Sequence, residues 1–108
     1  MNLMDYTYNA QKTAIYPKDR AIEYLGLGLL SEAGEVAGKI KKVIRDNNGV
    51  FDLEARMKIA DECGDVLWYL AVLCGEIGVP LESVAAKNNA KLLDRLARGV
   101  IGGSGDER

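Results

Sequence analysis

Two short pairs of carboxylates in this sequence could do metal chemistry, Glu32 with Glu35 and Glu62 with Asp65. The members of each pair are three residues apart, so on an α-helix they lie on one face, roughly 4.5 Å apart along the axis. If the two helices pack together, the four carboxylates converge, and a cation must neutralise them. Because the chain has no histidine, we expect a hard divalent cation held by oxygen atoms, Mg²⁺ or alternatively Mn²⁺.

A plainer interpretation of the first pair is a solvent-exposed helix face. Glu35 and Lys39 are four residues apart, a spacing that gives a surface ion pair worth only a few tenths of a kcal/mol. The second pair fits that interpretation less well, because Asp65 leads directly into the wholly apolar run 66–74. A carboxylate in that position is at least partly buried and needs a partner.

Basic side chains gather near the end of the chain. Helical spacing puts four of them on one face: Lys87, Lys91, Arg95 and Arg98. Such a stripe is usually a solvated face. Beside metal-binding carboxylates it also suits a polyphosphate, because Lys and Arg take the phosphate charge that the cations leave. Lys39, which flanks the first acidic pair, is a further candidate for phosphate binding.

The composition argues against several kinds of function. A net charge of -2 over 108 residues gives no overall attraction to nucleic acid. The first residues lack the basic start and apolar stretch of a signal peptide, and the run 66–74 is too short to cross a bilayer. We therefore expect a cytoplasmic protein without nucleic-acid or membrane partners. Cys63 and Cys74, in a chain without histidine, give no zinc site.

Caps, breakers and apolar periodicity predict an all-α fold, a bundle of four to five helices. The expected helices cover residues 2–13, 19–46, 53–77 and 80–98. We predict a single domain, 1–108, with an N-terminal helix and pocket segment (1–18), a helical core (19–98) and a glycine-rich tail or lid (99–108). The run 66–74 is apolar all round its helix, which predicts a partner subunit and hence an oligomer.

The second predicted helix contains four glycines: Gly26, Gly28, Gly34 and Gly38. Each costs about 1 kcal/mol relative to alanine in a helix interior. We expect close packing or the close approach of a ligand to compensate for that cost.

The strings around the acids resemble the signature of MazG-like nucleoside triphosphate pyrophosphohydrolases. They are Ser-Glu-Ala-Gly-Glu-Val at 31–36 and Asp-Glu-Cys-Gly-Asp-Val-Leu-Trp-Tyr at 61–69, followed by a basic pair at 91 and 95. The likeness covers roughly residues 20–98, and the glycine-rich ending resembles the tails of short, stand-alone members, some from phages. The resemblance implies a MazG-like bundle that cleaves a nucleoside triphosphate between the α and β phosphates, giving a monophosphate and pyrophosphate.

The resemblance also implies roles for individual residues. The metal ligands and catalytic residues would be Glu32, Glu35, Glu62 and Asp65. Lys91 and Arg95 would hold phosphates, and one carboxylate would orient or deprotonate the attacking water. The sequence departs from some members at Ser31 and Cys63, where they carry further acids, so the number of metal ions stays open.

Base recognition has weaker signals. Candidates by position and chemistry are Gln11, Thr13, Tyr16, Asn88 and Trp68. Tyr16 and Trp68 also suit a hydrophobic core. We favour a purine deoxynucleotide such as dGTP, and the pyrimidine substrates dCTP and dUTP stay open.

Two other functions fit parts of the sequence. A non-enzymatic helical homo-oligomer would use the acids and bases as structural salt bridges. A carboxylate-bridged di-iron bundle shares the helix-borne acids but normally includes Glu-x-x-His pairs, which this chain lacks. Separately from the enzyme hypothesis, the all-round apolar run 66–74 predicts self-association into at least a dimer. A dimer of dimers, with sites completed across an interface, is the alternative assembly.

Overall fold

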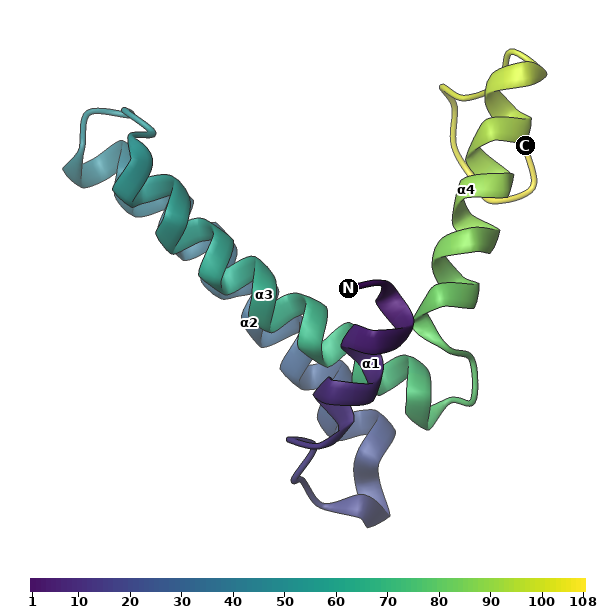
Figure 1. The fold of residues 1–108 in the computed structure, drawn as a ribbon. Helices are drawn as coiled ribbons and strands as arrows, with labels where there is room; N and C mark the ends of the chain where they lie inside the picture. The colour runs from purple at the N-terminus through teal and green to yellow at the C-terminus, as the bar shows by residue number, and fades with distance from the viewer.

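The chain is helical, without strands, in the computed structural model, which describes all 108 residues. It contains four α-helices and one short 3-10 helix (Figure 1). In chain order they are α1 (Leu3–Gln11), η1 (Lys18–Arg20), α2 (Ala21–Asp46), α3 (Leu53–Glu76) and α4 (Leu81–Ala97). The predicted all-α class, with four to five helices, is confirmed.

α1 is shorter than predicted at both ends, and α2 is shorter at its start. α1 ends at Gln11 because the amide and the hydroxyl of Thr13 both bond the carbonyl of Ala10, at 3.0 and 2.9 Å, which tightens the chain into a turn. α2 begins at Ala21 because residues 18–20, after Pro17, form the separate 3-10 turn. At its other end α1 has a capping box, in which the Asn2 side chain accepts from the Asp5 amide at 2.8 Å.

Sequence signals placed the other helix ends within a residue or two. Asn48 and Gly49, at φ 53° and 71°, turn the chain after α2. Asp52 caps α3 by accepting from the Ala55 amide at 2.9 Å. Gly78, at φ 79°, ends the turn after α3, and Gly99, at φ 72°, follows α4.

α2 and α3 form a long antiparallel hairpin, and α1 lies against its open end (Figure 1). Two small apolar clusters hold this end together. The first centres on the buried residues Ala10, Leu25 and Val72, and the second on Ala71, Cys74 and Leu81. The core thus lies where α1, α2, α3 and the start of α4 meet, and the far end of the hairpin extends away from it.

α4 forms a second arm. The chain bends by 100° between α3 and α4, and α4 contacts α1 and α3 but not α2 (Figure 1). No single helix of the chain is long and apolar enough to cross a membrane, although α3 and the sharply bent α4 together reach the necessary length and composition.

This open shape leaves much apolar surface uncovered. The radius of gyration is 16.8 Å, whereas a compact domain of this length has about 13 Å. Only nine of the 108 residues are buried. Among the large hydrophobic residues of α2, Leu27 and Leu30 are the most exposed, above 70%. Among those of α4, Leu93 and Leu96 are the most exposed, above 60%. The run 66–74 is the best covered part of the chain, with three residues buried and the rest half-buried.

The four glycines of α2 differ in what surrounds them. A Cβ on Gly28 would come within 2.1 to 2.6 Å of the Tyr69 ring, so the expected close packing exists there. Gly26, Gly34 and Gly38 face open space in this chain. For these three positions no packing within the chain explains the absence of a side chain.

Candidate functional site

Three of the four predicted metal ligands come together in the middle of the hairpin. Glu32 from α2 and Glu62 and Asp65 from α3 bring carboxylate oxygens within 4.8 Å of one another. Glu32 and Glu62 are half-buried, whereas Asp65 is exposed. The predicted partial burial of Asp65 is therefore wrong, because its side chain lies at the surface before the covered run 66–74 begins. The three-residue spacing of Glu62 and Asp65 puts both on the face of α3 that meets α2, as the sequence predicts. We call these three residues the acidic cluster.

The acidic cluster has no cationic partner within the chain. None of the six ion pairs involves Glu32, Glu62 or Asp65. Burial raises the pKa of Glu32, and the nearby charges of Asp65, Glu62 and Glu35 raise it further. A set of oxygen donors with uncompensated negative charge fits a hard divalent cation such as Mg²⁺ or Mn²⁺.

Glu35 lies beside the acidic cluster rather than in it. It is exposed on α2, one turn further toward the hairpin tip, and is close enough for its charge to raise the pKa of Glu32. The surface ion pair between Glu35 and Lys39, which the plainer interpretation predicts, does not form. The carboxylate of Glu35 is therefore available to a ligand at the edge of the cluster.

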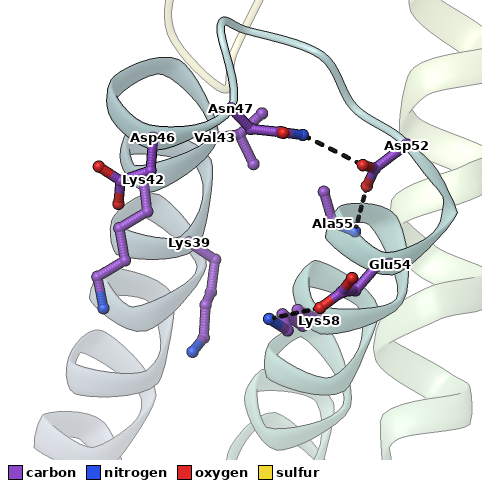
Figure 2. A pocket seen from close by; sticks show the side chains of 9 residues that line it. All are labelled: Lys39, Lys42, Val43, Asp46, Asn47, Asp52, Glu54, Ala55 and Lys58. Carbon is purple, nitrogen blue, oxygen red and sulfur yellow. Dashed lines mark hydrogen bonds and ion pairs between the residues drawn. The ribbon is translucent and has the colours of Figure 1, made fainter.

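A cavity rich in lysine lies next to the acidic cluster, toward the hairpin tip. It has a volume of about 410 Å³, and three lysines, Lys39, Lys42 and Lys58, line it (Figure 2). Three acids, Asp46, Asp52 and Glu54, line the same cavity nearer the tip. Lys58 is bonded to Glu54 at 3.1 Å, whereas Lys39 and Lys42 have no ion pair. Lys39 is one helical turn beyond Glu35 on α2, between the acidic cluster and the hairpin tip.

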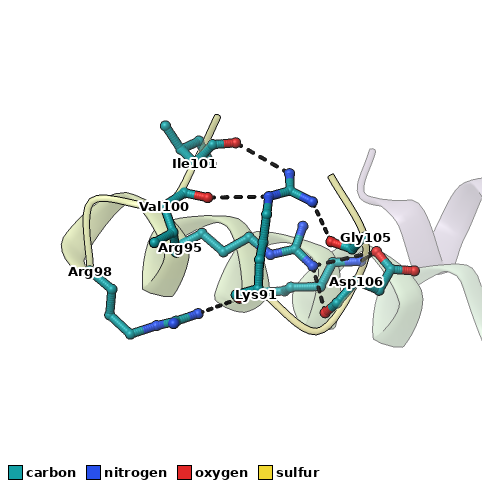
Figure 3. Close-up of polar contacts among 8 residues, drawn as sticks. Lys91, Arg95, Arg98, Val100, Ile101, Gly105 and Asp106 are labelled. Atoms are coloured by element: carbon teal, nitrogen blue, oxygen red, sulfur yellow. Dashed lines mark hydrogen bonds and ion pairs between the residues drawn. The ribbon is translucent and has the colours of Figure 1, made fainter. Parts of the chain in front are cut away.

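The basic residues of α4 lie on the other arm of the chain. Lys91 and Arg95 bond Asp106 of the tail, which runs back along α4 (Figure 3). Since α4 does not contact α2, the chain does not bring this pair to Glu32. Predicted phosphate binders thus occur on both arms, Lys39 beside the acids and Lys91 with Arg95 apart from them.

Comparison with known proteins decides the family. The sequence model of the MazG nucleotide pyrophosphohydrolase domain matches residues 20–98, which include α2, α3, α4, the acidic cluster, Glu35 and the basic residues described above. The chain belongs to the MazG family. It is also 43% identical, over 114 aligned positions, to the Gene 37 protein of Mycobacterium phage L5, with both chains covered in full. No solved structure matches it significantly.

Two tyrosines border the acidic cluster of this MazG domain. Tyr69 is one turn beyond Asp65, and burial raises its pKa, followed by the effects of Tyr24 and Glu32. Burial also raises the pKa of Tyr6, and the charge of Asp65 adds to it. The four-residue spacing from Asp65 is enough to predict that Tyr69 lies on the acidic face of α3. Tyr6 was missed, because only the packing of α1 on the hairpin brings it there, and no local sequence pattern signals that contact.

Most of the candidates for base recognition lie together at the open end of the hairpin. The Trp68 indole donates to the hydroxyl of Thr13 at 2.8 Å. Gln11 and Tyr16 line a cavity of about 280 Å³ together with residues 72, 75 and 76 of α3. The Tyr16 hydroxyl bonds Glu76, and its pKa rises to about 12, through burial first and this hydrogen bond second. Four of the five candidates thus lie in one region of the structure.

Asn88 is the exception among those candidates. It is exposed on α4, on the arm that carries Lys91 and Arg95. The MazG match begins at residue 20, so Gln11, Thr13 and Tyr16 lie in the segment that precedes the matched domain. Three of the five candidates for base recognition therefore precede the matched domain, whereas Trp68 and Asn88 lie within it.

Proposed function

We propose that this MazG-family protein is a metal-dependent nucleoside triphosphate pyrophosphohydrolase. It would cleave the bond between the α and β phosphates and release a nucleoside monophosphate and pyrophosphate. The observation that carries the proposal is the meeting of Glu32, Glu62 and Asp65 from two helices, with no cation of the protein to neutralise them. Membership of the MazG family supports a nucleotide as the substrate.

The acidic cluster would hold Mg²⁺ or Mn²⁺, and Glu35 would complete the set of acids. A divalent ion bound there would polarise a phosphoryl oxygen and help to acidify the attacking water. The carboxylates themselves would orient that water and accept its proton. Lys39 and Lys42, which have no ion pair in the chain, would stabilise the negative charge of the leaving pyrophosphate.

The order of groups along the hairpin supports a nucleotide lying parallel to it. The lysine cavity is on one side of the acidic cluster, and the cavity of Gln11 and Tyr16 is on the other. Trp68 is one turn beyond Asp65, and its bond to Thr13 lies between the cluster and that second cavity. A triphosphate directed toward the lysines would therefore place its sugar and base toward α1.

A purine deoxynucleotide such as dGTP is the substrate that we propose. Tyr16 stacks on Tyr24 with ring centroids 5.8 Å apart, which forms an aromatic surface at the open end of the hairpin. Such a surface favours the larger base, because stacking area increases with ring size. The pyrimidine nucleotides dCTP and dUTP are the alternative that the same experiment tests.

We also infer that the protein self-associates, as a dimer or a dimer of dimers. The support is the exposed apolar surface of α2 and α4, and the separation of Lys91 and Arg95 from the acids in a single chain. A second copy would cover the apolar faces and could bring its α4 to the acidic cluster of the first. A substrate from the nucleotide pool makes the cytoplasm the compartment that we propose.

The non-enzymatic alternative is a helical homo-oligomer that uses its acids in structural salt bridges. It predicts ion pairs at the acids of the hairpin, but neither the acidic cluster nor Glu35 forms one within the chain. This alternative also predicts that chelation of divalent ions leaves stability and nucleotide binding unchanged.

The test is product analysis with the eight common ribo- and deoxyribonucleoside triphosphates, each with Mg²⁺ and with Mn²⁺. Running the reaction in ¹⁸O-water identifies the attacked phosphorus, because attack at the α phosphate labels the monophosphate and attack at the β phosphate labels pyrophosphate. Glu62→Gln is the site variant. Glu23→Gln is the matched control, since Glu23 is an exposed acid whose ion pair is with Arg20.

The proposal expects monophosphate and pyrophosphate, loss of turnover in Glu62→Gln, and normal turnover in Glu23→Gln. The base preference appears in the same panel of substrates. Release of inorganic phosphate, or equal activity in both variants, would contradict the proposed reaction. Absence of turnover with all eight substrates, together with stability that chelators do not change, would favour the non-enzymatic homo-oligomer.

A further inference from the structure

The tail after α4 folds back onto the basic stripe of that helix. Lys91 donates to a carboxylate oxygen of Asp106 at 3.3 Å (Figure 3). Arg95 donates to the main-chain oxygen of Asp106 at 2.7 Å and to its carboxylate at 3.4 Å. Through these bonds, one acidic residue of the tail lies between Lys91 and Arg95, the two side chains to which the resemblance to MazG-like enzymes gives phosphate binding.

Arg95 is the only charged residue that this chain buries, at 3% exposure. A guanidinium group removed from water needs an anion or acceptor oxygens to replace its hydration. Here both oxygens come from Asp106. The neighbouring lysine and arginine hold the pKa of the Asp106 carboxyl below its usual value, so this carboxylate is ionised at neutral pH. The place beside Arg95 is therefore an anion site with an occupant.

The contact between Asp106 and α4 is also weak enough to be broken by a ligand. The Asp106 side chain is 85% exposed, and ion pairs of that exposure contribute little to stability. Four glycines, at 99, 102, 103 and 105, lie between α4 and Asp106. Three of them have positive φ, 72°, 132° and 85° at positions 99, 103 and 105. Glycines lose much conformational freedom on ordering, so the ordered tail is only weakly favoured over a released one.

The folded tail is closed by two further arginines. Arg108 donates to the carbonyls of Val100, Ile101 and Gly105, and Arg98 donates to the main-chain oxygen of Arg108 at 2.7 Å. Apart from the bonds of Lys91 and Arg95 to Asp106, these contacts join the tail to itself or to the end of α4. Asp106 is thus the link between the tail and the middle of the helix.

We propose that residues 99–108 form a displaceable strap, in which Asp106 occupies the anion site of Lys91 and Arg95 until a polyphosphate ligand replaces it. Pyrophosphate and nucleoside triphosphates carry more charge and more acceptor oxygens than one carboxylate, and the fork of Arg95 binds two phosphate oxygens at once. Singly charged anions gain no such advantage over Asp106. The choice of a polyphosphate as the ligand rests on the proposed function. The existence of the anion site rests only on the bonds of Lys91 and Arg95 to Asp106.

The experiment follows the tail directly while pyrophosphate is added to the full-length protein without divalent ions. Amide signals of Gly102, Gly103 and Gly105 in ¹H–¹⁵N spectra report whether the tail is ordered. In the wild type we expect these signals to move toward random-coil positions as pyrophosphate saturates. Asp106→Asn should bind pyrophosphate about two- to fivefold more tightly, since it lacks the competing charge. Glu107→Gln, the adjacent acid with no bond to α4, is the matched control and should behave as the wild type.

Three results would overturn the strap. Pyrophosphate could bind while the tail glycines keep their positions, which would show that the tail and the ligand do not compete. Asp106→Asn could bind more weakly, which would make the tail part of the ligand site. Pyrophosphate could also fail to bind both the wild type and Asp106→Asn, which would remove the anion site itself.

The strap and the proposed function can fail separately. If triphosphates are hydrolysed and Glu62→Gln abolishes the hydrolysis, but Asp106→Asn changes neither affinity nor KM, the function stands and the strap is wrong. If no triphosphate is hydrolysed, but pyrophosphate still releases the tail glycines, the strap stands and the function is wrong.

Discussion

The two arms of this chain differ in whether their charged side chains are neutralised within the chain. On the hairpin of α2 and α3, three carboxylates converge and nothing in the chain neutralises them. On α4, Lys91 and Arg95 are held by an acid from the chain's own tail. The hairpin thus presents a site that lacks its counter-ion, whereas α4 presents one that already contains an anion.

This difference gives the two arms different requirements for a ligand. Binding of any hard cation would stabilise the hairpin, because the folded chain already holds the repelling carboxylates of the acidic cluster close together. The α4 arm gains only what a ligand offers beyond Asp106. A polyphosphate with its metal ion suits both requirements, since it brings cations to one arm and a stronger anion to the other.

The largest expected effect concerns the hairpin. Asp65→Asn should lower kcat/KM for the nucleotide by at least about 100-fold, because a metal ligand positioned for the transition state is lost. The same change should leave the melting temperature without divalent ions unchanged or higher, since it removes one of the repelling charges. Adding Mg²⁺ should then raise the melting temperature of the wild type but that of the variant much less.

Calorimetry with and without a chelator measures both effects on stability. An Asp65→Asn protein that is strongly destabilised in the absence of metal would show that the carboxylate has a structural partner. In that case the acids of the hairpin, like the bases of α4, would be neutralised within the protein, and the two arms would not differ.

The second prediction tests whether α4 needs another copy of the chain. Leu93 is 65% exposed on α4, and covering one leucine contributes about 2 kcal/mol, or about 30-fold in a dissociation constant. Leu93→Asp should therefore shift the oligomer toward smaller species by at least this factor, as measured by light scattering over a concentration series. Ser83→Asp adds the same charge at the other end of α4 and should have a smaller effect. Monomeric wild-type protein at micromolar concentration would contradict self-association.

Local signals in the sequence determined the helices well. Asp52 is a good N-cap, and Gly78 and Gly99 take the left-handed conformation that ends a helix, so the bounds follow from short-range chemistry. The three-residue spacing also placed Glu62 and Asp65 on the face that meets α2. Each of these inferences depends on contacts within about one helical turn.

Contacts between distant segments were beyond the sequence. The direction of α4 depends on the bend after α3 and on packing against α1, and neither leaves a periodic pattern. The place of Tyr6 near Asp65 and the bond of Arg95 to Asp106 likewise join residues that are more than one helical turn apart in the chain. The tail was expected to be a frayed end or a lid, and its glycine content gave no sign of which residue it would contact.

The third prediction concerns the packing that holds the hairpin together next to the acids. Gly28→Ala would put a methyl group within 2.6 Å of the Tyr69 ring, so the ring or α2 must shift. We expect a loss of about 1 to 2 kcal/mol in the free energy of unfolding, after the gain in helix propensity. Gly26→Ala, which meets open space, should be neutral or stabilising by up to about 1 kcal/mol. Equal effects of the two changes in urea unfolding would mean that Tyr69 is not packed against Gly28.

The smallest expected effect concerns the tip of the hairpin, where a carboxylate is stabilised by neutral donors. The Ala55 amide and then the Asn47 side chain hold the pKa of Asp52 below its usual 3.8. Because the folded pKa is the lower one, the ionised cap contributes stability above pH 3.8, and this contribution is lost as the pH falls through the folded pKa. Asp52→Asn keeps a capping oxygen but cannot ionise. The wild type should therefore be slightly more stable than Asp52→Asn at pH 7, and the difference should disappear once the pH has fallen through the lowered folded pKa of Asp52. A difference that stays constant over this range in urea unfolding would show that the charge of Asp52 contributes nothing, and that its oxygen alone begins α3.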